Sequence, residues 1–347
     1  MTLPFLNKDC LIGLSPMDDI TDLPFRELCK EFGADLLVTE FIASEALNRD
    51  AEKSFRKMRF TENQRPIGIQ IFGANEEELL RCLEVVEQAE PDFIDINWGC
   101  PVRKVAGKGA GSGILKDVPK MLGITASIVK KSHLPVTVKT RLGYSADSMM
   151  VTDFAEALQD TGIAALAIHG RTKNQMYSGS ADWTMIGEVK NNPRMHIPIF
   201  GNGDITTAAQ AIDSKRRYGV DGILIGRGAI GNPWIFEQCA RLFHGELCES
   251  REGSTLVCMS EAEQGGRSQL EREVSVAERV EVCRRHLHMA VDFKGERTAI
   301  FEMRKHYGAY FKGLFNFKPF RLALVSATTL VDLDALLDRI KEHYIGQ

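Results

Sequence analysis

The sequence IPIFGNGDITTAAQAIDSKRRYGVDGILIGRG, residues 197–228, contains the pattern that decides the fold. An apolar run, Ile197–Gly201, is followed by a polar loop and an amphipathic stretch, Thr206–Arg217, and a second apolar run follows at Gly222–Ile225. Short runs that are nearly continuous in apolar residues are typical of parallel strands buried on both faces. The stretch therefore predicts a strand–helix–strand unit of a parallel sheet.

The same alternation extends from Leu11 to Ile235, with eight strand-like runs in series. Eight successive strand–helix units predict an α/β protein of the closed (β/α)₈ (TIM) barrel type rather than an open doubly wound sheet. The expected helices include Glu76–Gln88, Pro119–Lys131, Thr152–Thr161 and Thr206–Arg217. The expected strands are Leu11–Leu14, Leu36–Thr39, Ile67–Ile71, Phe93–Asn97, Val136–Thr140, Ala165–His169, Ile197–Gly201 and Gly222–Ile225.

Three segments are expected along the chain. Residues 1–245 are the predicted barrel and catalytic domain, and the polar, net acidic stretch 246–272 is a predicted linker or insertion. Residues 273–347 return to a helical period, which predicts a small C-terminal all-helical domain. Its expected helical stretches are Val274–Phe293, Arg297–Lys312 and Phe320–Ile340.

Composition places the chain among ordinary globular proteins. Apolar residues make up 44% and charged residues 26%, and the net charge of −4 requires any nucleic-acid site to be a local basic patch. No segment approaches the roughly 20 apolar residues of a membrane span, and no secretion signal is recognisable. The eight cysteines are scattered without a CxxC pair, which favours reduced thiols. We expect a cytoplasmic protein without a structural metal, a membrane anchor or an obligate protein partner.

Polar residues and glycines follow the strand-like runs in the sequences SPMDD, TEF, FGAN, NWGCP, RLG, HGRT, GNGD and GRG. In a barrel these loops share the C-terminal rim, where active sites lie. The alternative is that they are only turns, which favour the same residues. Because the pattern recurs after all eight runs, a site is the better interpretation.

Two of these loops have the features of a phosphate site. Gly201-Asn202-Gly203-Asp204 follows the seventh run, with a helix expected from Ile205, and Gly226-Arg227-Gly228 follows the eighth. Backbone N–H groups, a helix N-terminus and an arginine attract anions, and barrels commonly bind phosphate after strands seven and eight. Two tight turns remain the alternative.

Cationic side chains gather on the same rim. Lys139 ends the fifth run, where a lysine is costly to bury without a partner, and a flavin offers one at the N1/O2 edge of its ring. Gln70 ends the third run and is placed to bond the amide edge of such a ring. Arg141, His169 and Arg171 lie on the same rim, so an anionic ligand or a developing negative charge is expected.

Cys100, in Asn97-Trp98-Gly99-Cys100-Pro101, is the one cysteine on the predicted rim loops. Most cysteines are inert packing residues, which is the expectation for the other seven. A thiol with a pKa of about 8.5 is mostly protonated at neutral pH, so it can act as a general acid beside an atom that accepts a proton.

These motifs together resemble the dihydrouridine synthase family. SPMDDITD (15–22), QIFG (70–73), NWGCP (97–101), GAGSG (109–113), VKTRLG (138–143), IHGRT (168–172), GNGDI (201–205) and IGRGAIGNPWIF (225–236) stand in the family's order and spacing. RKHYGAYFKGL (304–314) resembles its C-terminal helical domain. Asp18-Asp19 departs from the small residues usual in bacterial members, and 246–272 is an extra insertion.

The resemblance implies an FMN-dependent enzyme that uses NADPH, or NADH, to reduce the C5=C6 bond of uridine in the D-loop of tRNA. It implies that Cys100 is the catalytic acid that protonates C5. The implied substrate-binding residues are Asn97, Arg141, Arg171, Arg304 and Lys305, with His169 also near the uracil. The implied cofactor-binding residues are Pro16, Met17, Asp18, Gln70, Lys139, His169, Asn202, Gly203, Asp204, Gly226 and Arg227.

In the helical domain, basic residues alternate with Tyr307 and Tyr310, a combination that suits phosphates and unpaired bases. The alternative is an amphipathic helix whose tyrosines lie in the core. Three other functions compete for the whole chain: a flavin barrel acting on a free pyrimidine and resembling dihydroorotate dehydrogenase, a non-catalytic tRNA-binding protein, and a phosphosugar isomerase or aldolase.

Overall fold

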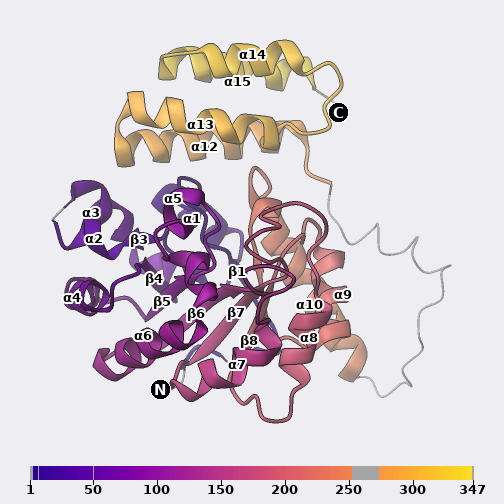
Figure 1. Ribbon diagram of the computed structural model, residues 1–347. Helices are drawn as coiled ribbons and strands as arrows, with labels where there is room; N and C mark the ends of the chain where they lie inside the picture. Colours follow the sequence, from indigo (N-terminus) through magenta and orange to yellow (C-terminus); the bar gives the residue numbers. More distant parts are fainter. Residues whose placement is uncertain (1–2, 7, 50, 252–272, 346–347) are drawn as a thin grey trace.

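Eight parallel strands form a barrel in the computed structural model, which describes residues 3–6, 8–49, 51–251 and 273–345 (Figure 1). Hydrogen bonds join the strands in the order β1-β9-β8-β7-β6-β5-β4-β2, and a parallel bridge between Gly13 and Leu36 closes the ring. The predicted (β/α)₈ barrel is therefore confirmed. Its strands are β1 (Leu11–Leu14), β2 (Leu37–Val38), β4 (Ile67–Phe72), β5 (Phe93–Trp98), β6 (Val136–Arg141), β7 (Ala165–His169), β8 (Ile199–Asn202) and β9 (Gly222–Ile225).

Two details of the sheet differ from the prediction. The strand expected at Leu36–Thr39 is shorter, and β3 (Ile42–Ala43) pairs with the end of β4. The strand expected to begin at Ile197 begins at Ile199, because Pro198 has no backbone N–H to donate to a ladder.

Helices cover the outside of the barrel, and capping side chains set several of their ends. Asp22 accepts from the Phe25 amide at the start of α1 (Leu23–Glu31), and Asn75 does the same for Glu78 in α4 (Glu76–Glu87). The others are α2 (Ser44–Leu47), α3 (Glu52–Met58), α5 (Arg103–Ala106), α6 (Val118–Lys131), α7 (Val151–Asp160), α8 (Thr184–Asn191), α9 (Ala208–Tyr218) and α10 (Trp234–Arg251).

Helix α9 begins later than expected. Thr207 and Gln210 form a capping box that starts the helix at Ala208, so the Gly201–Asp204 loop is not its first turn. The helix ends at Gly219, which adopts a φ of 72°, a conformation that glycine tolerates without strain. The backbone amides near the predicted phosphate site therefore belong mainly to the loop and not to the first turn of the helix.

Within residues 273–345 the structure has four helices: α12 (Val276–Lys294), α13 (Glu296–Tyr310), α14 (Lys318–Ser326) and α15 (Leu330–His343). The stretch Phe320–Ile340, expected to be continuously helical, contains a break because Thr329 caps a new helix by accepting from the Asp332 amide. Helix α10 continues to Arg251, past the expected barrel end at 245. The rest of the predicted linker, 252–272, lies outside the described residues.

The four C-terminal helices form a layer beside the barrel, with α12 and α13 on the barrel side (Figure 1). Phe25 of α1 packs against two buried histidines of this layer, with ring centroids 5.3 Å from His286 and 5.5 Å from His306. The Lys294 ammonium pairs with Asp22 of the barrel. The two parts therefore share an interface that is apolar and aromatic at its centre and ionic at its edge.

This interface predicts sensitivity to acid. Burial, together with the Lys294 and Lys305 cations, lowers the pKa of His286 to about 4, and only Asp22 among these groups acts in the opposite direction, while an unfolded histidine titrates at about 6.5. Between these pH values the unfolded state binds more protons, so the free energy of unfolding falls as pH drops below about 6.5, by about 3 kcal/mol in all. Melting temperatures between pH 7 and pH 4 test this.

His286→Phe keeps a ring against Phe25 and should remove the part of the acid sensitivity that His286 contributes, while His306, whose pKa is also lowered by burial, retains its own part. His288→Gln is the matched control, because His288 lies on the same helix at a 44% exposed position beside Asp334. Equal acid sensitivity of wild type and His286→Phe would contradict this account of the interface.

Within the residues that the structure describes, none of the helices combines the length and apolarity needed to cross a bilayer.

Candidate active site

A cavity of ≈ 830 Å³ opens at the C-terminal ends of the strands. This volume lies within the roughly 300–1,000 Å³ of sites that hold cofactors and small substrates. Lys312, which follows α13, reaches its lining, so the helical layer contributes to the mouth. The sequence-predicted residues in the lining are Pro16, Met17, Asp18, Asn97, Cys100, Lys139, Arg141, His169, Asn202, Gly203, Asp204, Gly226 and Arg227.

Lys139, His169 and Asn202 form one hydrogen-bonded group in the wall. Asn202 Nδ2 donates to the Leu224 carbonyl over 2.7 Å, which leaves Asn202 Oδ1 to accept from Lys139 Nζ at 3.0 Å. The same oxygen lies 2.8 Å from His169 Nδ1. Because that oxygen can only accept, we assign the proton of the imidazole to Nδ1.

The other nitrogen of this imidazole, His169 Nε2, is buried and has no hydrogen-bond partner among the residues that the structure describes. Burial and the nearby Lys139 and Arg141 cations lower the pKa of His169 to about 2, so the ring is neutral and Nε2 is an acceptor. A buried acceptor without a donor is costly. This lining therefore has a place for a ligand that donates a hydrogen bond.

Lys139 is buried, and one hydrogen bond occupies only part of its capacity of three donors. Burial, with a contribution from Arg141, lowers the pKa of Lys139 to about 8, while the Asp95 carboxylate acts in the opposite direction. The side chain thus remains mostly protonated at neutral pH. A buried ammonium with donors to spare suits an anionic or carbonyl-bearing ligand edge.

The two predicted phosphate loops meet around Asp204. Its carboxylate accepts from Arg171 at 2.9 and 2.7 Å and from Arg227 at 3.1 Å. Burial opposes its ionisation, but these hydrogen bonds and the Ala181 amide outweigh it and lower the pKa of Asp204. Arg227 is 53% exposed and lines the cavity, so it is the cation of this group that faces incoming ligands.

Gly228 has a packing reason to be glycine. A Cβ there would lie 2.2 Å from the Ile205 carbonyl oxygen, so only glycine lets the two loops touch.

Four predicted site residues lie outside this lining. Gln70 is fully buried between Asp95 and Asn97, and Arg171 is held by Asp204, Ser178 and Gly179. Both arrangements favour a role in supporting the residues that line the cavity. Direct contact of Gln70 or Arg171 with a ligand stays a prediction. The other two, Arg304 and Lys305, lie on α13 of the helical layer.

On α13 the structure corrects one interpretation. Tyr307 and Tyr310 are 0% and 1% exposed, and His306 is also buried, so these rings belong to the core and cannot stack on bases. Tyr310, for example, contacts His286 of α12 and Trp234 of α10. Lys305 Nζ donates to the Asp19 carbonyl, and the Arg304 guanidinium lies 4.2 Å from the centroid of the Phe301 ring.

The loop that carries Cys100 is held from both sides. Asn97 Oδ1 accepts from the amides of Gly99 and Cys100 at 2.9 and 2.8 Å. On the other side the Ser112 hydroxyl donates to the Cys100 carbonyl at 2.8 Å. Burial, assisted by Asp18, raises the pKa of Cys100, so its thiol is protonated at neutral pH. Cys100 is thus a fixed, protonated thiol in the cavity lining.

Arg141 joins this loop to the loop after β7. Its Nε donates to the Gly99 carbonyl at 2.8 Å, and one terminal nitrogen donates to the carbonyls of Thr172 and Met176. Burial lowers the pKa of Arg141 to about 10, which still leaves a cation at neutral pH.

Sequence reasoning missed Tyr177 and Asp95. The Tyr177 ring lies in the cavity lining, with its centroid 4.9 Å from the Arg227 guanidinium and 5.8 Å from that of Arg141. It stands in a long loop without a recognisable motif. Asp95 is buried in β5, and its alternation with Asn97 in FIDIN was a signal that both face the barrel interior.

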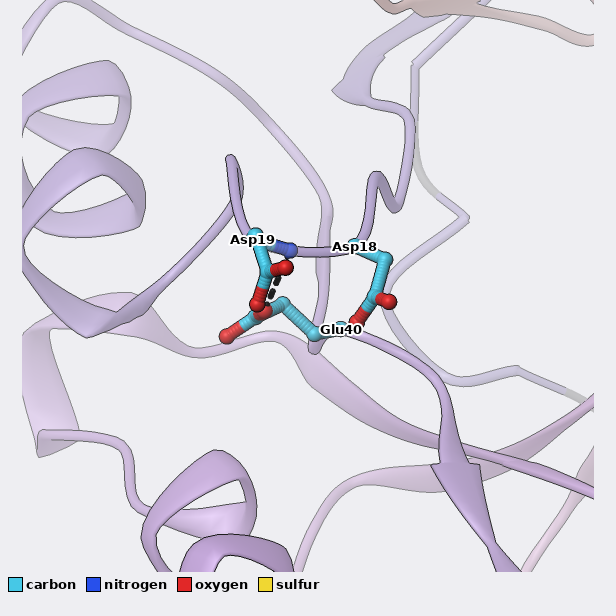
Figure 2. Close-up of side chains that lie close together, drawn as sticks. All are labelled: Asp18, Asp19 and Glu40. Carbon is cyan, nitrogen blue, oxygen red and sulfur yellow. Dashed lines mark hydrogen bonds between the residues drawn. The ribbon is translucent and has the colours of Figure 1, made fainter. Parts of the chain in front are cut away.

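Asp18, Asp19 and Glu40 bring three carboxylates together beside the cavity, and Figure 2 shows the Asp19 amide directed at Glu40. Lys57 Nζ lies 3.2 Å from Glu40 and 3.9 Å from Asp19, and it also pairs with Asp18. Lys53 adds a further ammonium 3.6 Å from Asp19. The cluster is therefore an ion-pair network, which explains how this rim accommodates two adjacent aspartates.

Comparison with known proteins gives a consistent result. The sequence profile of the family described as dihydrouridine synthase matches residues 13–344. A probable tRNA-dihydrouridine synthase of Rickettsia conorii is 33% identical over 334 residues, which cover 96% of this chain and 93% of the relative. The tRNA-dihydrouridine synthase B of Pseudomonas syringae is 33% identical over 95% of this chain and 90% of its own. That of Xanthomonas axonopodis is 39% identical over 67% and 70%.

Proposed function

The chain belongs to the dihydrouridine synthase family, and from that membership we propose that it is a tRNA-dihydrouridine synthase. In the proposed reaction FMN, reduced by NADPH or NADH, reduces the C5=C6 bond of a uridine in the D-loop of tRNA to 5,6-dihydrouridine. The observation that carries the proposal is that a protonated thiol, Cys100, and a buried cation, Lys139, line the same cavity. A reduction by hydride and proton addition needs both kinds of group.

The residues of this cavity fit FMN. Lys139 has unused donors, and His169 Nε2 is an acceptor without a partner in the described part of the chain. Arg227 with the glycine loops suits a phosphate. When bound and reduced, FMN would supply hydride for C6 of the uracil. Lys139 would stabilise negative charge on the ring, and Pro16 and Met17 would pack against its face.

Cys100 would deliver the proton. Addition of hydride at C6 leaves negative charge delocalised over C5 and O4 of the uracil, and C5 then accepts a proton from the thiol. Arg141 fixes the Gly99 carbonyl next to Cys100, and Asn97 holds the amides of the same loop. In the proposed reaction these side chains would position the acid, and Arg141 would also provide positive charge near the uracil oxygen.

A tRNA substrate requires the target base to leave its stack, which costs a few kcal/mol. In this proposal Lys312, which lines the cavity, and Arg304 and Lys305 on α13 would hold phosphates of the RNA and so offset that cost. NAD(P)H is the expected second partner, the cytoplasm the expected location, and no obligate protein partner is proposed.

A flavin barrel acting on a free pyrimidine is the second candidate, because the cavity alone would also suit such a ligand. It would not need the helical layer that contributes Lys312 to the mouth. Mapping of dihydrouridine in tRNA from cells that lack this protein separates the two. The proposal predicts loss of dihydrouridine at one or more D-loop positions, and an unchanged map with altered free pyrimidines would favour the alternative.

The purified protein is expected to be yellow with non-covalent FMN. Denaturation should release a compound with the absorbance and mass of FMN, because the cavity offers both ring and phosphate partners. A colourless protein that cannot be reconstituted with FMN would contradict the cofactor assignment and favour a non-catalytic RNA-binding protein.

A further inference from the structure

Asp95 lies beneath the active-site cavity and is not part of its lining. On the sheet it is in register with Gln70 of β4 and Thr137 of β6. Its two carboxylate oxygens accept from Gln70 Nε2 and from the Thr137 hydroxyl, both at 2.5 Å. The interior of the barrel thus holds a buried carboxylate with two cross-strand donors.

A chain of hydrogen bonds leads from this carboxylate to the catalytic loop. Gln70 Oε1 accepts from Asn97 Nδ2 at 2.8 Å. Asn97 Oδ1 in turn accepts from the backbone amides of Gly99 and Cys100. Asp95, Gln70 and Asn97 therefore connect the barrel interior to the main chain of Cys100, and of these three residues Asn97 alone lines the cavity.

The direction of this chain is fixed at both ends. Backbone amides can only donate, so Asn97 must turn its oxygen toward them and its NH₂ toward Gln70. Gln70 must then turn its own NH₂ downward, where it needs an acceptor, and Asp95 supplies one. An acceptor at position 95 is what allows both carboxamides to take the orientation that holds the Cys100 loop.

We propose that Asp95 is a positioning residue for Cys100 that acts through Gln70 and Asn97; its effect on catalysis rests on the function proposed above. Without the acceptor, the buried NH₂ of Gln70 loses its hydrogen-bond partner. The orientation of the Gln70 carboxamide is then no longer stabilised, and the group can rotate. Asn97 then loses its fixed orientation, and the thiol moves relative to its target. Displacements of about 1 Å in an active site can lower rates about 100-fold.

Asp95 also faces Lys139, whose positive charge it supports. That effect would act on the flavin half of the reaction, which does not use Cys100. The two effects are therefore separable by measuring NADPH oxidation and tRNA reduction on the same preparations.

The test uses the full-length, FMN-loaded protein in three variants. Asp95→Ala removes the acceptor. Asp95→Asn is the conservative rescue, because its side-chain oxygen still accepts from Gln70 and its NH₂ can donate to the Thr137 hydroxyl. Thr137→Val is the matched control, because it removes the other bond of the same carboxylate and leaves the chain intact.

The first readout is the rate at which iodoacetamide alkylates Cys100, followed by mass spectrometry of its peptide between pH 6 and 9. We expect Asp95→Ala to change this rate roughly tenfold, the equivalent of one lost buried hydrogen bond, and the other two variants to stay near wild type. Unchanged alkylation in a folded, flavin-loaded Asp95→Ala protein would overturn the proposal. Should Asp95→Ala not fold, Gln70→Leu cuts the next link and must show the same change.

The second readout is dihydrouridine formation in wild-type and Cys100→Ala backgrounds. Asp95→Ala should lower it about 10- to 100-fold in the presence of Cys100 and add nothing when Cys100 is absent. Equal losses in both backgrounds, or a loss confined to NADPH oxidation, would refute a role through Cys100. If the wild type forms no dihydrouridine, the proposed function fails, while the alkylation result still decides the positioning role.

Discussion

Cys100→Ala should keep its flavin and its NADPH oxidation while dihydrouridine formation falls about 10²–10⁴-fold, the usual contribution of a positioned general acid. Reduction of the flavin by NADPH does not involve the uracil and needs no thiol. Proton delivery to C5 does need one, and Cys100 is the cysteine in the cavity lining among the described residues. The measurement is dihydrouridine on a tRNA that lacks the modification, beside an NADPH-oxidase assay of the same preparation.

Cys100→Ser should be nearly as impaired, because an unactivated hydroxyl is a far weaker acid than a thiol. Cys29→Ala and Cys82→Ala are the controls, since both residues are fully buried on barrel helices and should affect stability alone. Full tRNA reduction by Cys100→Ala would remove Cys100 from the role of acid.

Lys139→Met is the second large expected effect. It should weaken FMN binding or slow flavin reduction about 10- to 100-fold, because a buried charged hydrogen bond is worth about 1.5–3 kcal/mol. The pKa of Lys139, about 8 before a ligand binds, adds a pH signature. The rate of flavin reduction in the wild type should fall as the pH rises above that pKa, because the Lys139 ammonium loses its proton. This inflection should be missing in Lys139→Met.

Lys190→Met is the matched control, because Lys190 pairs with Asp221 and is not in the cavity lining. It should leave flavin content and the pH profile unchanged. Normal flavin affinity and a normal pH profile in Lys139→Met would exclude Lys139 from the cofactor site.

The fold could be predicted from sequence because its signal is repeated. Eight apolar runs with polar loops at one end leave few alternatives, and the barrel confirms them. Errors fall where a local interaction outweighs periodicity. Thr329 begins a new helix within Phe320–Ile340, and the Thr207–Gln210 capping box delays α9. Apolar periodicity alone does not reveal either end.

The sequence was sufficient to predict which residues lie on the same rim of the barrel. It was less informative about which atoms each side chain contacts. Loops after parallel strands converge by topology, so Lys139, Cys100 and Arg227 could be grouped from the sequence alone. Whether a side chain faces the ligand or a neighbour depends on cross-strand register and on loop paths. Arg171 turns to Asp204 and Gln70 to Asp95 for that reason. The alternation in FIDIN indicates which face Asp95 lies on but not which side chains it contacts, so its role went unnoticed.

The most direct test incubates the FMN-loaded protein and NADPH with an unmodified tRNA transcript in one reaction and with free uridine or orotate in others. The products are measured by mass spectrometry. We expect dihydrouridine in the D-loop of the tRNA and no significant reduction of the free pyrimidines. Reduction of free pyrimidines with no dihydrouridine in tRNA would contradict the proposed function.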